Sequence, residues 1–435
     1  MKTALATGLL LILAAAPAQA ATDQLPPAVR LVLYKVSLLM EKKAYDQALE
    51  VIARFQQRAR AGFEPGRPDP RGYHHPRIYF AKGNCYLLQD KYRQAAAAYG
   101  RAVKLDPGYA PAWLNLARAC YELKNYPKAA QCFDRAYQAS ADKNPRHLYF
   151  SALAYMLAGD NRRCLAQFDK LLCAHRQAMK PAWKENLVHA LLAAGKPRRA
   201  LPFIRELAAT YSGEKQIRWQ EILIYQYLQL EMKAEALSLA RRLTAQAPTV
   251  ARWWKALAHL ELDRRAYRQA LVALVVYSYL EPLNGQEQKL LADLYLQLDI
   301  PAKAVPAYSA CLEQKPRPAL VRCLALAYQR LGKPAAALET IDRFAGNSRD
   351  PDLMMIRADL FYRLGRWNEA AAAYCKVAGS NCRHKARAWL MAGYAAWQAR
   401  DLEASRKAFT MAARYGRNKK MALAALDQLK EVQAQ

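Results

Sequence analysis

The residues of this chain that could carry covalent or metal chemistry are its nine cysteines and seven histidines. His74 and His75 are adjacent, but no Cys, Asp or Glu stands near them at metal-ligand spacing. Cys382-Arg383-His384 supplies too few ligands for zinc. No Gly-rich phosphate loop, His-Glu-x-x-His or Gly-x-Ser-x-Gly motif occurs. We therefore expect a protein that is not an enzyme and that holds no cofactor or metal.

The spacing of the cysteines does not recur along the chain, so a regular disulfide framework is not expected. Most of them stand where a predicted helix needs a small apolar residue, which favours buried free thiols. Cys375 with Cys382, and Cys311 with Cys323, join a helix to the segment after it and could pair in an oxidising compartment. Because nine is odd, at least one cysteine stays unpaired within a monomer.

A pattern of about 34 residues is written twice between Pro76 and Lys143. Each copy has apolar or small residues three and four apart in two halves, and a polar turn separates the halves. This spacing predicts a helix, a tight turn and a second helix. The matched residues are Tyr79, Tyr92, Ala95, Tyr99 and Ala102 in the first copy and Trp113, Tyr126, Ala129, Phe133 and Ala136 in the second.

The small residue of the second helix recurs down the chain at an average step of about 34 residues. We therefore predict eleven hairpins in succession. A single hairpin cannot bury its apolar face, so neighbouring hairpins must stack. The small residues are Ala48, Ala95, Ala129, Cys164, Ala200, Ala236, Ala270, Ala304, Ala337, Ala370 and Ser405.

The chain begins with a predicted signal peptide over residues 1–20. Lys2 gives a positive start, an apolar run follows, and Ala18-Gln19-Ala20 has the small residues that a signal peptidase recognises. The alternative is that this segment stays uncut as an N-terminal membrane anchor. No later stretch of the sequence has the length of a membrane span. The expected order is then an N-terminal lead-in and capping hairpin over 21–60, a Pro/Gly-rich loop over 61–75, ten hairpins over 76–417 and a C-terminal capping helix over 418–435.

The chain is strongly basic, with 66 Lys and Arg against 36 Asp and Glu and a formal net charge of +30. The basic residues are spread over all hairpins, as in Arg162-Arg163 and Arg264-Arg265, and no nucleic-acid-reading motif accompanies them. Such a charge concerns partners and solubility rather than fold. Acidic protein segments, anionic lipid and lipopolysaccharide are the expected polyanions, and a solvated face that keeps the chain soluble is the alternative.

The repeated pattern resembles the tetratricopeptide repeat (TPR) signature, which has an aromatic residue, then Gly and Tyr, then Ala, an aromatic and Pro at later fixed positions. The resemblance implies an all-α solenoid of helical hairpins, a right-handed superhelix of about eleven repeats with a C-terminal capping helix. In this family the first helices line a concave groove that binds protein or peptide segments. The residues that carry it in the first copy are Tyr79, Gly83, Tyr86, Ala95, Tyr99 and Pro107.

One position of the first helix holds, in the family, an Asn that grips the backbone of an extended peptide. Of the eleven residues at this position only Asn84 keeps the amide, so a clamp for a C-terminal carboxylate is not expected. Aromatic residues with Arg are the usual anchors of an interface. The alternative for several candidates is packing between neighbouring first helices. The predicted groove residues are Arg77, Phe80, Asn84, Arg118, Tyr121, Tyr149, Tyr225, Tyr362, Tyr394 and Trp397.

A narrower resemblance lies in the runs 33–42, 83–86 and 253–258, which are similar to exported bacterial TPR proteins assigned to the TonB system. It implies a periplasmic scaffold within a cell-envelope machine of the TonB type. Two alternatives stay open. One is a holdase or assembly factor for outer-membrane proteins, and the other is a binder of envelope polyanions through the basic surface.

Overall fold

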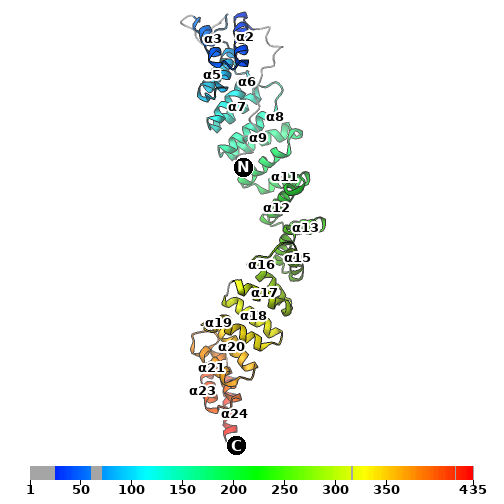
Figure 1. The fold of residues 1–435 in the computed structure, drawn as a ribbon, viewed down its shortest axis with the longest axis vertical. Helices are drawn as coiled ribbons and strands as arrows, with labels where there is room; N and C mark the ends of the chain where they lie inside the picture. Colours follow the sequence, from blue (N-terminus) through cyan, green and yellow to red (C-terminus); the bar gives the residue numbers. More distant parts are fainter. Residues whose placement is uncertain (1–24, 60–70, 315–316, 417, 435) are drawn as a thin grey trace. The chain divides into compact units, whose positions relative to one another are not determined.

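The computed structural model of the chain describes residues 25–59, 71–314, 317–416 and 418–434. These residues form α-helices and one short 3-10 helix joined by turns, with no strand among them (Figure 1). The predicted signal peptide, residues 1–20, and most of the predicted loop, residues 61–70, lie outside the described residues. No helix in the described part has both the length and the apolar character that a membrane span needs.

Even-numbered helices from α2 to α22 are the first helices of hairpins, and odd-numbered helices from α3 to α23 are the second helices. The bounds are α2 (Pro27–Glu41), α3 (Tyr45–Gln57), α4 (Pro76–Leu87), α5 (Tyr92–Leu105), α6 (Ala110–Glu122), α7 (Tyr126–Ala139), α8 (Pro145–Leu157), α9 (Asn161–Ala174), η1 (Arg176–Ala178), α10 (Pro181–Ala193), α11 (Pro197–Thr210), α12 (Gly213–Gln229), α13 (Lys233–Gln246), α14 (Ala251–Asp263), α15 (Tyr267–Leu280), α16 (Gly285–Gln297), α17 (Pro301–Gln314), α18 (Pro318–Arg330), α19 (Pro334–Ala345), α20 (Pro351–Arg363), α21 (Trp367–Gly379), α22 (Lys385–Gln398), α23 (Leu402–Ala412) and α24 (Lys419–Ala434).

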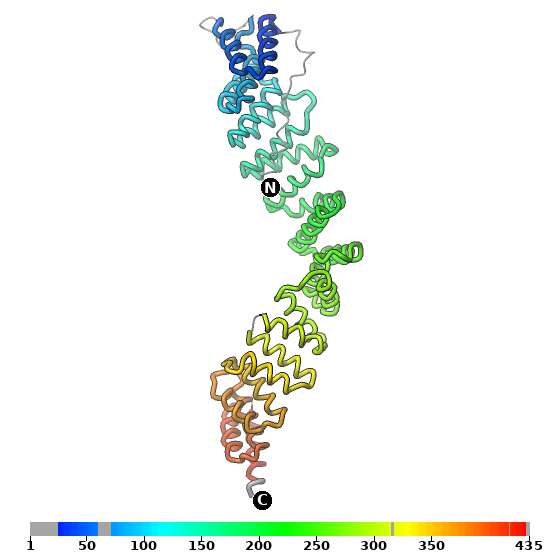
Figure 2. Tube along the Cα trace, viewed as in Figure 1, coloured from blue at the N-terminus to red at the C-terminus, as the bar shows by residue number. Residues whose placement is uncertain are grey.

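The chain divides into two compact units, Met1–Glu231 and Met232–Gln435. Within each unit every described α-helix packs against the one before it and the one after it (Figure 2). The predicted all-α solenoid of helical hairpins is thereby confirmed. Helices α12 and α13, which the sequence joins in one hairpin, belong to different units, so the domain limits expected from the sequence stay a prediction.

One residue with positive φ stands in each turn between a first and a second helix. The left-handed conformation stops the first helix, and the backbone N–H after it bonds back to the last turn, as from Lys91 N to Tyr86 O at 2.9 Å. Glycine adopts this conformation without steric strain, and it fills four of the turns. The residues are Lys43, Asp90, Lys124, Gly159, Gly195, Glu231, Arg265, Asp299, Gly332, Gly365 and Arg400.

The small residue of the second helix is fully buried in all eleven copies, from Ala48 to Ser405. Two first helices contribute a glycine to the crossing as well. A Cβ atom added at Gly83 would lie 2.5 Å from the Tyr99 ring, and one added at Gly393 would lie 2.5 Å from the Phe409 ring. Small side chains therefore allow the two helices of a hairpin to cross closely.

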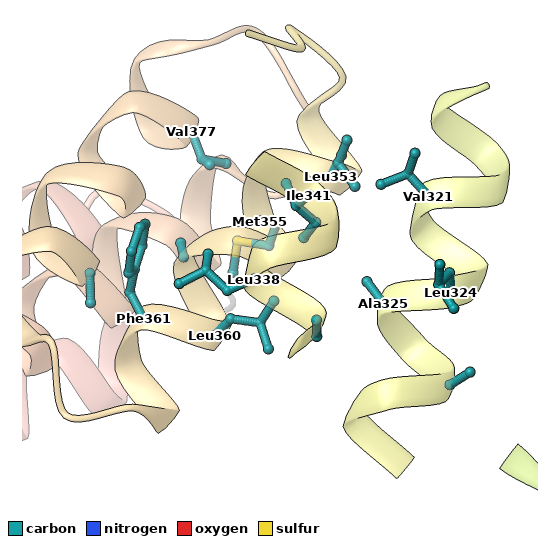
Figure 3. Packing of buried hydrophobic residues seen from close by; sticks show 14 of the residues in the cluster. Val321, Leu324, Ala325, Leu338, Ile341, Leu353, Met355, Leu360, Phe361 and Val377 are labelled. Atoms are coloured by element: carbon teal, nitrogen blue, oxygen red, sulfur yellow. The ribbon is translucent and has the colours of Figure 1, made fainter. Parts of the chain in front are cut away.

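The hydrophobic core runs from hairpin to hairpin. In the C-terminal unit one cluster of buried side chains includes residues from Ala292 on α16 to Ala408 on α23. Figure 3 shows its middle part, where Val321 of α18, Ile341 of α19 and Leu353 of α20 belong to the same cluster. No single hairpin completes this core, because each one buries its apolar face against its neighbours.

We predict that Gly83→Ala destabilises the hairpin of α4 and α5. The added methyl group must displace the buried Tyr99 ring, an overpacking cost of about 1–3 kcal/mol that outweighs the roughly 1 kcal/mol helix-propensity gain of alanine. Hydrogen–deuterium exchange of the amides of α4 and α5 should become faster. Gly100→Ala on α5 is the control, because nothing lies within 4 Å of its added Cβ. It should slow exchange, and equal behaviour of the two variants would contradict the packing argument.

Charged residues link consecutive first helices at one edge of the C-terminal unit. Asp352, in the first turn of α20, binds Arg322 of α18 at 2.8 Å and Arg383 before α22 at 2.8 Å. His384 Nε2 lies 2.6 Å from the same carboxylate. The hydrogen bonds from His384 and then Arg383 hold the pKa of Asp352 below its usual value. The ionised carboxylate therefore joins three neighbouring hairpins.

We predict that acid lowers the stability that Asp352 provides by joining neighbouring hairpins. Because the folded-state pKa of Asp352 is lowered, its stabilisation is complete above the unfolded value of about 3.9 and is lost as pH falls through the folded value. Asp352→Asn should lower the urea midpoint at neutral pH and flatten the decline of the midpoint below about pH 4. Asp427→Asn removes an exposed pair with Lys430 and should leave both quantities unchanged. Parallel acid profiles for wild type and Asp352→Asn would refute this role.

Candidate protein-binding surface

The residues predicted to line a groove all lie on first helices. Seven belong to the N-terminal unit and three to the C-terminal unit, so the structure brings them together only within each unit. Their positions are Arg77, Phe80 and Asn84 on α4, Arg118 and Tyr121 on α6, Tyr149 on α8, Tyr225 on α12, Tyr362 on α20, and Tyr394 and Trp397 on α22.

Two of the predicted residues are buried and pack between helices. Phe80 lies against Tyr99 and Tyr109, with ring centroids 5.8 and 5.1 Å away. Tyr149 stacks on Trp183 at 4.3 Å, and its hydroxyl accepts a hydrogen bond from Asn186 at 2.8 Å. At these two positions the structure shows the packing role that the sequence left open as an alternative.

Tyr225 is the most accessible of the predicted aromatic residues, since 57% of it is exposed. Apart from the buried Phe80 and Tyr149, the other predicted aromatic residues are half-buried and contact a neighbouring ring. Tyr121 meets the edge of Tyr126 at 5.5 Å, and Tyr362 meets the edge of Trp367 at 4.9 Å. Each of these side chains is held in place by packing, which lowers the entropy cost of using its free side for binding.

Tyr394 and Trp397 on α22 share one partner in the core. Both rings meet the buried Phe409 ring of α23 edge to face, at 5.0 and 6.3 Å between centroids. Both side chains are half-buried. This pair is therefore part of the packing of the last hairpin, with its outer side open to solvent.

Arg77 and Arg118 stand on adjacent first helices and are half-buried. Within the described residues neither forms an ion pair, and the Nε atom of Arg118 has no hydrogen-bond partner. Their charges act on nearby tyrosines: Arg77 lowers the pKa of Tyr109, although burial dominates and raises it to about 12. Tyr109 thus stays a neutral phenol, and the strip along α4 and α6 presents two arginines without an ion pair in the described chain beside aromatic rings. Such a strip suits a carboxylate-bearing segment.

Asn84 has an internal role at the position where the family resemblance implies a peptide contact. Its Oδ1 accepts hydrogen bonds from the Tyr99 hydroxyl at 2.7 Å and from Asn115 Nδ2 at 2.9 Å. Tyr99 is fully buried, and a buried hydroxyl requires a partner. The oxygen of Asn84 therefore satisfies the hydrogen-bonding needs of its own hairpin.

The same arrangement recurs in two hairpins of the C-terminal unit. The Tyr308 hydroxyl donates to Asp293 at 2.6 Å, and the Tyr374 hydroxyl donates to Asp359 at 2.6 Å. In each pair the tyrosine follows its acceptor by 15 residues. The other eight hairpins have no Asp, Glu, Asn or Gln at the position of Asn84. They also have no tyrosine 15 residues later; one of them has Leu153 and Phe168 at these two positions. The sequence carries this signal as a tyrosine 15 residues after Asn84, Asp293 or Asp359.

We predict that the two members of such a pair can be replaced together but not singly. Tyr308→Phe removes the donor to Oδ1 of the partly buried Asp293, whose Oδ2 still accepts from Lys289, and should cost about 1 kcal/mol. The double variant Asp293→Leu/Tyr308→Phe places at these two positions the residue types that Leu153 and Phe168 supply in another hairpin, and it should recover most of that loss. Urea unfolding of the single and double variants measures the coupling; simple additivity of the two single effects would show that no pair exists.

All nine cysteines are free thiols, so neither Cys375 with Cys382 nor Cys311 with Cys323 forms a disulfide. Burial raises the pKa of Cys85 to about 11 and that of Cys164 to about 12, which makes both poor nucleophiles. The His74 side chain, which the sequence placed beside His75, has a hydrogen-bond partner in the fold: its Nδ1 lies 2.8 Å from the Tyr79 hydroxyl.

A family model described as tetratricopeptide repeat matches residues 80–145, 323–381 and 357–419. These stretches are tetratricopeptide repeats. TPR hairpins typically form non-catalytic platforms for protein interaction, and the matched stretches lie in both units of this chain.

A curated relative is the tetratricopeptide repeat domain-containing protein PYG7, chloroplastic, of Arabidopsis thaliana. It is 40% identical over 57 residues, which make up 13% of this chain and 19% of the relative. The match thus spans less than a fifth of that relative's length.

Three solved structures are similar in fold. A tetratricopeptide repeat protein from Parabacteroides merdae ATCC 43184 has 16% identity and a TM-score of 0.33, covering 57% of this chain and 98% of that one. The MamA protein has 16% identity and a TM-score of 0.35, covering 39% and 94%. The APC/C hetero-tetramer Cut9-Hcn1 has 13% identity and a TM-score of 0.30, covering 92% and 84%.

Proposed function

We propose that this TPR protein is a periplasmic, non-enzymatic scaffold that binds acidic protein segments along its first helices, within a cell-envelope machine of the TonB type. The observation that carries the binding part is the strip on α4 and α6, where Arg77 and Arg118 have no ion-pair partner among the described residues and lie beside packed aromatic rings. A segment with carboxylates would neutralise these charges, and the rings would hold its apolar side chains.

The cell-envelope part of the proposal is supported by the sequence alone. Residues 1–20 have the features of a cleavable signal peptide, and the runs 33–42, 83–86 and 253–258 resemble exported TPR proteins of the TonB system. The net charge of +30 suits a partner with acidic segments. Fractionation of cells that express a C-terminally tagged chain tests the location. Recovery from the periplasm with Ala21 as the new N-terminus is expected, and recovery from the cytoplasm would overturn it.

Binding is tested by in-cell crosslinking from a photoreactive amino acid at Tyr121 or Tyr225, followed by mass spectrometry. Both positions lie on first helices, and Gln131, exposed on the second helix α7, is the matched control. We expect capture of one dominant envelope protein from Tyr121 and little from Gln131. Capture of many unrelated outer-membrane precursors would assign the protein as a holdase instead.

Charge reversal distinguishes specific contacts of the two arginines from non-specific electrostatic attraction. Arg77→Glu/Arg118→Glu should reduce capture from Tyr121 by about tenfold, because each arginine meets a carboxylate at close range. Lys430→Glu makes a charge change on the exposed outer side of α24 and should leave capture unchanged. If both variants reduce capture equally, net charge rather than the strip governs binding.

A further inference from the structure

The second helix α15 exposes apolar side chains on its outer face. Val272 is 61% exposed and Tyr279 is 85% exposed, and Val276 between them is half-buried. Residues four and seven apart lie on one side of an α-helix, so the three side chains form a stripe about two turns long. A helix with apolar residues on both its inner and outer faces is expected to be covered on both.

Comparison with the other hairpins shows that this stripe is not a requirement of the repeat. Counted from the small buried residue of each second helix, none of the ten other helices has a branched aliphatic or aromatic residue at the positions of Val272 and Tyr279. At the position of Val276 seven of the ten have Lys or Arg, where a basic residue faces solvent. These residues are Arg54, Arg101, Arg135, Lys170, Arg242, Arg343 and Lys376.

A hollow of about 450 Å³ adjoins the stripe at Val272 and is lined by residues of α13, α14 and α15. Its lining residues include the apolar Trp254 and Leu257 and the basic Arg241 and Arg268. The exposed stripe therefore leads into a recess large enough to take an apolar side chain of a partner.

Charge in the hollow is unbalanced. Glu261, only 2% exposed, accepts hydrogen bonds from Arg241 at its Oε1, at 2.6 and 3.1 Å. Its Oε2 has no hydrogen-bond partner within the described chain, and Arg264 Nη1 lies 3.6 Å away. Arg268 forms no ion pair in that part of the chain. Two arginines thus lie beside the Glu261 carboxylate and a third, Arg268, lines the same hollow, which leaves an excess of positive charge and one buried oxygen that can accept a hydrogen bond.

We propose that the outer face of α15 and the adjoining hollow form a docking site for an acidic amphipathic helix of a partner protein. Apolar side chains of the partner at a spacing of i, i+4 and i+7 would cover Val272, Val276 and Tyr279, and its carboxylates would pair with Arg268, which lines the hollow, and with Arg264, which lies beside Glu261. A second copy of this chain is disfavoured as occupant, because both copies carry a net charge of +30. The site lies on a second helix, separate from the first helices that bind protein segments in the proposed function. The protein can then hold two partners at once.

The test uses a fluorescein-labelled synthetic helix of about 14 residues with Leu at the contact positions and Glu elsewhere, titrated with the full chain by anisotropy. The variant Val272→Glu/Val276→Arg/Tyr279→Gln takes at each position a residue that other second helices hold, as in Glu50, Arg242 and Gln57, so it should fold. Unchanged circular dichroism confirms this. We expect micromolar binding to the wild type and binding at least about tenfold weaker to the variant.

Two controls define the chemistry and the place. A probe with Lys in place of Glu should bind at least about tenfold more weakly than the acidic probe, because basic residues line the hollow. Tyr121→Ser, on a first helix, should leave the affinity unchanged, which separates this site from the proposed first-helix strip. Equal affinity of the wild type and the triple variant for the acidic probe, or equal affinity for both probes, would overturn the proposal.

Two other occupants give distinct outcomes. Cosedimentation of the wild type, but not of the triple variant, with phosphatidylglycerol vesicles at a salt concentration that does not release it would assign the face to a lipid surface. Concentration-dependent dimerisation in sedimentation, lost in the triple variant, would assign it to a second copy. Either result overturns the docking of an acidic helix, and neither changes what crosslinking from Tyr121 reports.

Discussion

The structure depends on the close crossing of two helices at a small, fully buried side chain. This residue is fully buried from Ala48 to Ser405, and in the hairpins that lie within one unit its small size lets the two helices approach closely, while large rings such as Tyr99 fill the space beside the crossing. A hairpin built in this way still has an uncovered apolar face. Stacking covers it, which is why the core continues from one hairpin to the next instead of closing within any of them.

Close packing at the helix crossing requires every buried polar group to have a hydrogen-bond partner within the protein. Tyr99, Tyr308 and Tyr374 each bring a hydroxyl into the buried helix crossing, and an oxygen of the first helix accepts its hydrogen bond, as Asp293 does for Tyr308 and Asp359 for Tyr374. Where the second helix has Phe or Ile, the acceptor is absent as well. The position that the family resemblance links to peptide contact thus makes an internal hydrogen bond in these three hairpins.

Side chains that lie outside the crossing are free to differ. The repeat constrains the buried face of each helix and leaves the outer face open to change, which is how α15 can carry Val272 and Tyr279 where neighbouring hairpins carry polar or small residues. The arginines on α4 and α6, which form no ion pair in the described chain and lie beside packed rings, are a second feature that is local to its hairpins. Two surfaces with different chemistry on one solenoid fit a scaffold that brings partners together.

The sequence by itself determined the fold class, because the spacing of small residues, aromatics and turn residues is a local pattern that repeats and needs no long-range information. Only the tertiary structure decided which side chains are available. Phe80 and Tyr149 look like groove residues from their helix positions, yet neighbouring hairpins bury both, and Tyr225 stays exposed. Burial depends on contacts between residues far apart in the sequence, which the periodicity of one helix does not contain. For the same reason the partner of Asn84 became evident only when Tyr99 was placed beside it.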